Sequence, residues 1–156
     1  ELIHNMMVSK RANAVIYLPN GLKAIKTYSS VVFVFEDIKS DAYEIELFDY
    51  INLPNGKNIE RVKKTTMTDN NVCFLSSSDI KLPLHVRSRK NGDKMNVKGM
   101  LGSKKINDIF IDCKVGTKDR DLWPIVVDAN GIIVWLPGLK KSKFDKTKYD
   151  IILKYY

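Results

Sequence analysis

Short β-rich segments separated by turn sequences run through most of this chain, and they restrict it to folds built on sheets. Residues 31–35 are a continuous run of valine and phenylalanine, and residues 43–47 alternate apolar side chains with glutamates. The tetrapeptide Leu-Pro-Asn-Gly occurs at residues 18–21 and 53–56, where proline fixes φ and asparagine and glycine tolerate positive φ. We therefore expect strands and tight turns over residues 14–74.

A further strand is expected directly after Pro83. Leu84 and Val86 alternate with polar residues and should face the core. Arg87 and Arg89 would then be exposed together on the opposite face of the strand.

The remaining segments predict helices, a hairpin and a last strand. They are a helix over 103–114, a short helix over 117–122, a hairpin over 125–136 and a strand over 149–156. Ser103 and Thr117 are the expected N-caps. In the longer helix the buried stripe would be formed by Ile106, Ile109, Phe110 and Cys113.

These elements predict an α+β fold that is rich in strands and has two or three short helices. A chain of 156 residues is long enough to form one domain with its own core. Burial should be strongest at six positions on apolar faces, namely Val86, Ile106, Phe110, Val126, Val127 and Trp135.

The sequence divides into two unequal parts. Residues 1–8 place apolar side chains on one face of an expected helix. Residues 9–156 would form a single domain with a hairpin-rich half, 9–80, and a basic half, 81–156.

Positive charge is concentrated in one quarter of the sequence. Residues 81–120 hold 11 Lys and Arg against 4 Asp and Glu, a net charge of +7, whereas the whole chain carries +8. Residues 1–80 carry a net charge of −1. Such asymmetry favours a polyanionic partner, although a solvated basic face is an equal alternative on charge alone.

The sequence Gly99-Met-Leu-Gly102-Ser103-Lys104-Lys105 is the strongest candidate for anion binding. Lysines at the start of a helix oppose the helix dipole, so a function for them is favoured over a poorly capped helix. The spacing does not match a phosphate-binding Walker loop, which needs four residues between its glycines.

Other basic residues flank the turn at Asn91-Gly92. Arg87, Arg89, Lys90 and Lys94 could grip phosphates, or they could be solubilising charge with Asp93 paired to one of them.

Both tryptophans and one further arginine are weaker candidates for contact with a ligand. Arg120 lies between two aspartates and is a secondary candidate. Trp123 and Trp135 could stack on bases, but each lies in an apolar stretch, which favours core packing.

No constellation of residues indicates catalysis or metal binding. Cys73 and Cys113 have apolar neighbours and should be buried thiols of a reducing cytosol. His4 and His85 are far apart, so no metal site is expected. The apolar runs are shorter than the roughly 20 residues of a membrane span, so no membrane partner is expected.

An ordered set of motifs covers about half of the chain. The motifs are Leu-x-Val-Arg-x-Arg-x-x-Gly-Asp-x-Met at 84–95, Gly-x-x-Gly-Ser-Lys-Lys-x-x-Asp-x-Phe-x-Asp-x-Lys-Val at 99–115, arginine at 120, Trp-Pro-x-Val-Val-Asp at 123–128 and Ile-x-Trp-x-Pro-Gly at 133–138. This set closely resembles the C-terminal domain of bacterial tRNA(Ile)-lysidine synthetase. The segment from Leu18 to Tyr28 also resembles the hairpin that precedes this domain in the family, and residues 1–8 resemble the tail of the helical domain before that hairpin.

The resemblance implies a parent ligase that uses ATP to join lysine to the wobble cytidine of tRNA(Ile), a tRNA modification that forms lysidine. The family's catalytic N-terminal domain carries a Ser-Gly-Gly-x-Asp-Ser loop, and this chain has no adjacent glycines. We therefore expect no catalytic residue and no bound cofactor here, with ATP belonging to the parent.

The resemblance also implies a fold similar to a tRNA-synthetase domain, namely a β-sandwich-like domain with flanking short helices. Such a domain would hold the acceptor end of tRNA, and the protein would be cytoplasmic. The expected partners are tRNA(Ile), the catalytic domain of the same protein and a second copy of the parent as a homodimer. The expected tRNA-binding residues are Arg87, Arg89, Lys90, Lys94, Ser103, Lys104, Lys105 and Arg120.

Two other functions are compatible with the residues alone. A protein-interaction or dimerisation domain would position the catalytic domain through apolar surfaces and would depend weakly on salt. An enzyme acting on a phosphorylated metabolite at residues 102–105 would need a convergent acid or base, which the sequence does not provide.

Overall fold

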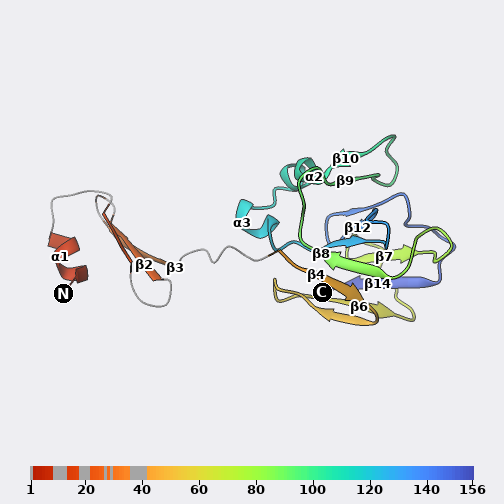
Figure 1. Ribbon diagram of the computed structural model, residues 1–156, viewed down its shortest axis with the longest axis horizontal. Coiled ribbons are helices and arrows are strands. Elements are labelled where there is room, and N and C mark those ends of the chain that lie inside the picture. Colours follow the sequence, from red (N-terminus) through yellow and green to blue (C-terminus); the bar gives the residue numbers. More distant parts are fainter. Residues whose placement is uncertain (1, 9–13, 18–21, 27, 29, 36–41) are drawn as a thin grey trace. The chain divides into compact units, whose positions relative to one another are not determined.

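The computed structural model describes residues 2–8, 14–17, 22–26, 28, 30–35 and 42–156 (Figure 1). The chain divides into two compact units, Glu1–Asp41 and Ala42–Tyr156. The second unit contains the basic segment and both tryptophans.

The first unit combines one helix with a three-stranded antiparallel sheet. Its elements are α1 (Leu2–Val8), β1 (Val15–Tyr17), β2 (Leu22–Lys26) and β3 (Val31–Phe35), with the strand order β1-β2-β3. The side chain of Lys26 donates a hydrogen bond to the carbonyl oxygen of Met7 at 3.1 Å. The expected helix over residues 1–8 is confirmed, whereas the expected turn at 18–21 lies outside the described residues.

The second unit is built on two larger antiparallel sheets. The five-stranded sheet has the order β13-β12-β11-β8-β4, from Lys140–Lys141, Ile133–Leu136, Ile125–Val127, Leu84–Arg87 and Glu44–Leu47. The four-stranded sheet has the order β5-β6-β14-β7, from Tyr50–Asn52, Asn58–Val62, Ile151–Tyr155 and Val72–Leu75. The expected turn at 53–56 connects β5 to β6, and Gly56 has a φ of 83° there.

The two sheets pack face to face around the first of two cores. Alternate residues of β8 and β14, among them Val86 and Leu153, face this core together with Trp135. Because each sheet contains strands from before and after residue 80, the hairpin-rich and basic halves of the sequence share both sheets. The expected β-sandwich is confirmed.

A third layer covers the other face of the five-stranded sheet (Figure 1). It consists of β9 (Lys94–Met95), β10 (Lys104–Lys105), α2 (Ile106–Asp112) and α3 (Thr117–Arg120). Ile109 and Phe110 pack with Ile125 and Leu136 in the second core. Strands β11 and β12 are therefore buried on both faces, which explains why their sequences are continuously apolar.

The burial predictions are confirmed at all six positions, none of which exceeds 2% exposure. The hairpin over 125–136 is confirmed, with an irregular register between Val126 and Val127. The last strand is confirmed from Ile151.

Both helix starts differ from the predicted ones. The longer helix begins at Ile106 and not at Ser103, because Lys104 and Lys105 are held in an extended strand paired with β9. Lys105, and not Ser103, occupies the N-cap position, and its side chain makes no capping hydrogen bond. In α3 the N-cap is Gly116 and not Thr117.

The second core offers a direct test of this layered packing. Replacing Phe110, which is fully buried, with alanine should lower the free energy of unfolding by about 3–5 kcal/mol because it leaves a cavity. Ile111 follows it in the same helix and is 58% exposed, so Ile111→Ala should cost much less, about 0.5 kcal/mol. Urea denaturation of both variants measures the difference, and equal losses would contradict the assignment of helix faces.

Candidate nucleic-acid interface

The first expected binding residue, Arg87, is buried and serves the fold. Only 5% of the residue is exposed, so the prediction that it faces solvent beside Arg89 is wrong. Its guanidinium donates two hydrogen bonds of 2.9 Å to the carboxylate of Asp93 and a third, also 2.9 Å, to the carbonyl oxygen of Ser88. The third layer covers the strand face that the alternation assigned to solvent.

Asp93 closes the turn that follows this strand. Its carboxylate also accepts a hydrogen bond of 2.7 Å from the backbone N–H of Lys90. Burial alone would raise the pKa of Asp93, but the hydrogen bonds from Arg87 and Lys90 and the charge of Arg87 together hold that pKa below its ordinary value.

Directly after the turn, two lysines face each other across an antiparallel strand pair. Lys94 of β9 is the register partner of Lys105 of β10, and both side chains are exposed. Residues directly opposite each other in such a pair have Cα atoms about 4.5–5.5 Å apart. Like charges at that spacing destabilise a sheet, so stability alone does not account for this arrangement.

The loop that joins these strands carries the remaining residues of the predicted anion site. Gly99 and Gly102 adopt positive φ angles of 80° and 72°. Ser103 is exposed, and Lys104 forms an ion pair with Asp112, whose hydrogen bond raises the pKa of Lys104. Lys104 is therefore partly neutralised, whereas Lys105 has no carboxylate partner among the described residues.

Arg89 and Lys90 line a polar cavity of about 310 Å³ beside the turn. Arg89 pairs with Asp121 at 2.8 Å and donates a hydrogen bond of 2.9 Å to the side-chain oxygen of Asn107. These partners hold the guanidinium between the turn and α2, while Lys90 is exposed. We name the group formed by Arg89, Lys90, Lys94, Ser103, Lys104 and Lys105 the cationic surface.

Arg120, the last basic candidate, makes different contacts from the residues of the cationic surface. Its Nε donates a hydrogen bond of 2.9 Å to the carbonyl oxygen of Val115, and the residue is half-buried at the end of α3. The side chain therefore fastens α3 to the end of α2.

Both tryptophans belong to the cores, as favoured from the sequence. Trp135 is fully buried, and its indole N–H lies 3.3 Å from the carbonyl oxygen of Asn70. Trp123 is half-buried, packs edge-on against Phe110 and donates to the carbonyl oxygen of Pro137 at 2.9 Å. Trp135 therefore has no exposed face for stacking on a base.

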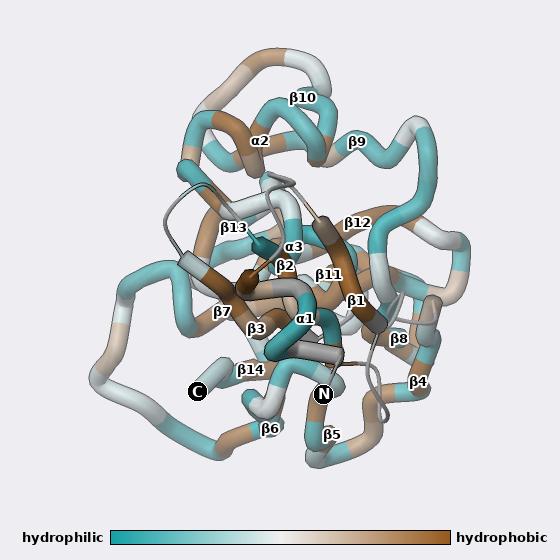
Figure 2. The backbone as a smooth tube through the Cα atoms, turned by 90° about the vertical axis from the view of Figure 1, so that its left-hand side faces the viewer, coloured by the Kyte–Doolittle hydropathy of each residue, from teal (hydrophilic) through white to brown (hydrophobic). Residues whose placement is uncertain are grey.

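Sequence reasoning missed the apolar tip of the loop between β9 and β10. Leu101 is fully exposed and Met100 is 53% exposed, and Figure 2 shows hydrophobic colour at this tip next to the hydrophilic β10. The signal was present in the sequence, because two large apolar residues between two glycines cannot reach a core from a tight loop.

Across the described part of the chain, no group of three or more His, Cys, Asp or Glu side chains is placed to hold a metal ion. Cys73 is buried, which raises the pKa of its thiol, and Cys113 is half-buried; both are free thiols. None of the described helices has the length and apolar character that crossing a membrane requires.

The two arginines of the motif at 84–95 should respond differently to substitution. Arg87→Ala should lower the free energy of unfolding by about 3–5 kcal/mol, because it leaves the largely buried carboxylate of Asp93 without its partner. Arg89→Ala removes a partly exposed pair with Asp121 and should cost at most about 1 kcal/mol. Chemical denaturation of the two variants measures both values, and a small loss for Arg87→Ala would refute its structural role.

The same pair predicts a dependence of stability on pH. A carboxyl group with a lowered native pKa stabilises the fold above its ordinary pKa of 3.8, and this contribution is lost as pH falls through the native value. Unfolding free energies measured from about pH 5 to about pH 2 should therefore fall less steeply in Asp93→Asn than in the unmodified chain. Parallel curves would show that Asp93 has no lowered pKa.

Comparisons with known proteins agree with the motif analysis. Residues 84–151 match the family model described as the TilS substrate C-terminal domain. The chain is 42% identical to the tRNA(Ile)-lysidine synthase of Bacillus subtilis, over 85% of this chain and 30% of that protein. It is 38% identical to the bifunctional protein TilS/HprT of Listeria innocua, over 98% of this chain and 25% of that protein.

A solved structure extends the agreement to the fold. A crystal structure of a TILS C-terminal domain superposes with a TM-score of 0.67 at 38% identity, covering 74% of this chain and 96% of that one. The chain spans only 25% to 32% of the length of the synthases and bifunctional proteins that it matches. The sequence, the sheets and the loop motifs together place this chain in the family of the TilS substrate C-terminal domain.

Proposed function

We propose that this chain binds tRNA(Ile) for a parent tRNA(Ile)-lysidine synthase, holding phosphates near the acceptor end on the cationic surface. The observation that carries the proposal is the pair of exposed lysines, Lys94 and Lys105, directly opposite each other in β9 and β10. A phosphate between the two ammonium groups would convert their repulsion into two charge-assisted hydrogen bonds.

Neighbouring groups extend this receptor along the third layer. Lys90 lies at the turn before β9, and Arg89 is held beside it by Asp121 and Asn107. Asp121 and Asn107 already accept from Arg89, so this arginine would meet a phosphate through its remaining N–H groups. Arg87, in contrast, contributes by fixing the turn and not by contact, and Arg120 is a secondary candidate because it is half-buried at the end of α3.

The parent protein would supply the chemistry. In this proposal the parent uses ATP to join lysine to the wobble cytidine in the cytoplasm, and this chain without its catalytic domain is inactive. Its partners are tRNA(Ile), the catalytic domain of the same protein and, in a homodimer, a second parent copy. Residues 1–8 would be the end of a preceding helical domain, and residues 9–156 the tRNA-binding domain, with its basic half at 81–156.

A second function, docking of the parent's other domains, is favoured by one specific observation. An apolar groove of about 240 Å³ opens between the edges of the two sheets, with Phe48 and Leu82 at 71% and 46% exposure. A surface of this kind suits a protein partner and not a phosphate backbone. The two functions use different parts of the second unit and are compatible.

Removal of the opposed lysines tests the tRNA proposal. The double variant Lys94→Ala, Lys105→Ala should bind an isoleucine tRNA transcript more weakly, and the slope of log K against log salt should become shallower by about 0.7–0.9, because the one phosphate held between the two lysines is lost. Its stability should be unchanged or raised by a few tenths of a kcal/mol, because the like charges no longer oppose each other.

The matched control removes the same charge elsewhere. Lys57 and Lys81 are exposed and lie outside the cationic surface, so replacing both with alanine should leave the salt slope within about half a unit of the unmodified chain. Equal losses in both double variants would mean that tRNA is held by diffuse charge, and the proposed site would be wrong.

A further inference from the structure

A second cavity lies between β7, β13 and the segment that precedes β14. It measures about 320 Å³, and its walls include Phe74, Tyr149, Lys98, Lys141 and Lys146. None of these residues belongs to the cationic surface. The combination of aromatic rings with several ammonium groups is the chemistry that binds an unpaired nucleotide, since every base has a face for stacking and every nucleotide carries a phosphate.

The aromatic part of the cavity presents an accessible ring. Tyr149 packs against Phe74 with ring centroids 4.8 Å apart and a tilt of 48°, and 47% of Tyr149 is exposed. Phe74 is half-buried, and the ammonium group of Lys141 lies 5.5 Å from its ring centroid. Phe74 is therefore occupied on its inner side and supports Tyr149, which leaves part of the tyrosine ring open to a ligand.

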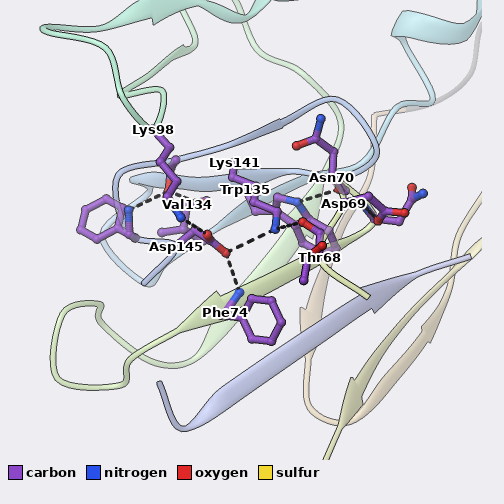
Figure 3. A network of polar contacts seen from close by, with 12 residues as sticks. Thr68, Asp69, Asn70, Phe74, Lys98, Val134, Trp135, Lys141 and Asp145 are labelled. Carbon is purple, nitrogen blue, oxygen red and sulfur yellow. Dashed lines mark hydrogen bonds and ion pairs between the residues drawn. The ribbon is translucent and has the colours of Figure 1, made fainter. Parts of the chain in front are cut away.

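The cationic part is held rigidly by a buried carboxylate (Figure 3). Asp145 is 5% exposed; it accepts a hydrogen bond of 2.9 Å from the backbone N–H of Phe74 and forms ion pairs with Lys98 at 2.6 Å and Lys141 at 3.9 Å. Lys141 also donates to the carbonyl oxygen of Thr68 at 3.0 Å. Burying such a group costs desolvation, and replacement by apolar residues is often no less stable, so stability alone is a weak explanation for it.

The charge balance of the cavity leaves it positive. Three lysines line it against the single carboxylate of Asp145. Lys146 has an additional partner, Asp79, at 2.8 Å outside the lining, and one positive charge remains even when Asp79 is included. Because Lys98 and Lys141 are fixed by their partners, an anion would meet ammonium groups that need little reorganisation.

The cavity is connected to the cationic surface through one short segment. The backbone N–H of Lys98 donates to the carbonyl oxygen of Lys141 at 3.0 Å, and Val97 forms a β-bridge with Ser142. Lys98 lies four positions after Lys94, a span of at most about 14 Å in an extended chain. A strand of nucleic acid lying on Lys94 can therefore reach the cavity within a few nucleotides.

We infer that the cavity between Tyr149 and Lys98 binds an unpaired nucleotide of the RNA, with its base against Tyr149 and its phosphate near Lys98, Lys141 and Lys146. This inference rests on the proposed tRNA-binding function, because the duplex phosphates on the cationic surface would deliver the single strand to the cavity. The site would thus distinguish RNA with an unpaired end from blunt duplex RNA.

The test compares two RNA hairpins, one blunt and one with a short single-stranded overhang, by fluorescence anisotropy with the full 156-residue chain. Tyr149→Ala should weaken binding of the overhang hairpin by roughly 5- to 150-fold, the range for loss of one stacked base, and should leave the blunt hairpin unaffected. Tyr149→Phe keeps the ring and should bind both like the unmodified chain. Tyr50, which is 53% exposed on β5, provides the matched control, and Tyr50→Ala should change neither affinity.

A second measurement needs no variant and reports stacking directly. A fluorescent adenine analogue in the overhang should be quenched on binding to the unmodified chain. Absence of quenching, or an equal loss of affinity for both hairpins in Tyr149→Ala, would overturn the inference. Displacement of the overhang by free adenosine monophosphate at similar concentration would also overturn it, because the cavity would then be a site for free nucleotides.

The two proposals fail in different ways. One outcome is that the Lys94→Ala, Lys105→Ala variant loses affinity for both hairpins while Tyr149→Ala keeps its affinity for both. In that case the proposed function is supported and the inference about the nucleotide cavity is wrong. If the lysine variant keeps full affinity for the blunt hairpin, the proposed function is wrong whatever the result at Tyr149.

Discussion

The ion pair between Arg87 and Asp93 joins the sandwich to the layer that carries the candidate interface. Arg87 ends β8, an interior strand of the five-stranded sheet, and donates to both oxygens of Asp93. The same aspartate accepts from the backbone of Lys90, and its carbonyl oxygen accepts a hydrogen bond of 2.9 Å from the N–H of Ile106, the first residue of α2. One residue therefore fixes the turn, the register of β9 and the start of the helix.

That constraint explains which predictions from the sequence succeeded. The apolar positions of β8 and α2 were predictable because they lie on a face whose period matches the element, and those of β11 because a short continuous apolar run indicates a fully buried strand. Exposure of Arg87 was predicted wrongly, because alternation assigns residues to two faces but does not reveal that a second layer covers one of them. The helix start was misplaced for a related reason, since the pairing of Lys104 and Lys105 with β9 depends on residues ten positions away.

The same structure also accounts for where the excess charge lies. Several carboxylates of the basic region are engaged by particular cations: Asp93 by Arg87, Asp112 by Lys104, Asp121 by Arg89 and Asp145 by Lys98. The exposed lysines of β9 and the adjoining turn have no such carboxylate among the described residues. At physiological salt, charges are screened over about 8 Å, so a local cluster attracts phosphate more effectively than the net charge of the chain.

Membership of a family therefore identifies the domain, but it does not assign a role to each residue of a shared motif. Arg87 and Arg89 stand two positions apart in one motif, yet one is enclosed with its aspartate and the other borders a polar cavity. Their burial distinguishes the two roles. Under the proposed function, substitution of Arg87 would weaken binding by disordering the turn, whereas substitution of Arg89 would weaken it by removing a phosphate contact. Binding and stability must consequently be measured on the same variants, since loss of affinity without loss of stability is what identifies a contact residue.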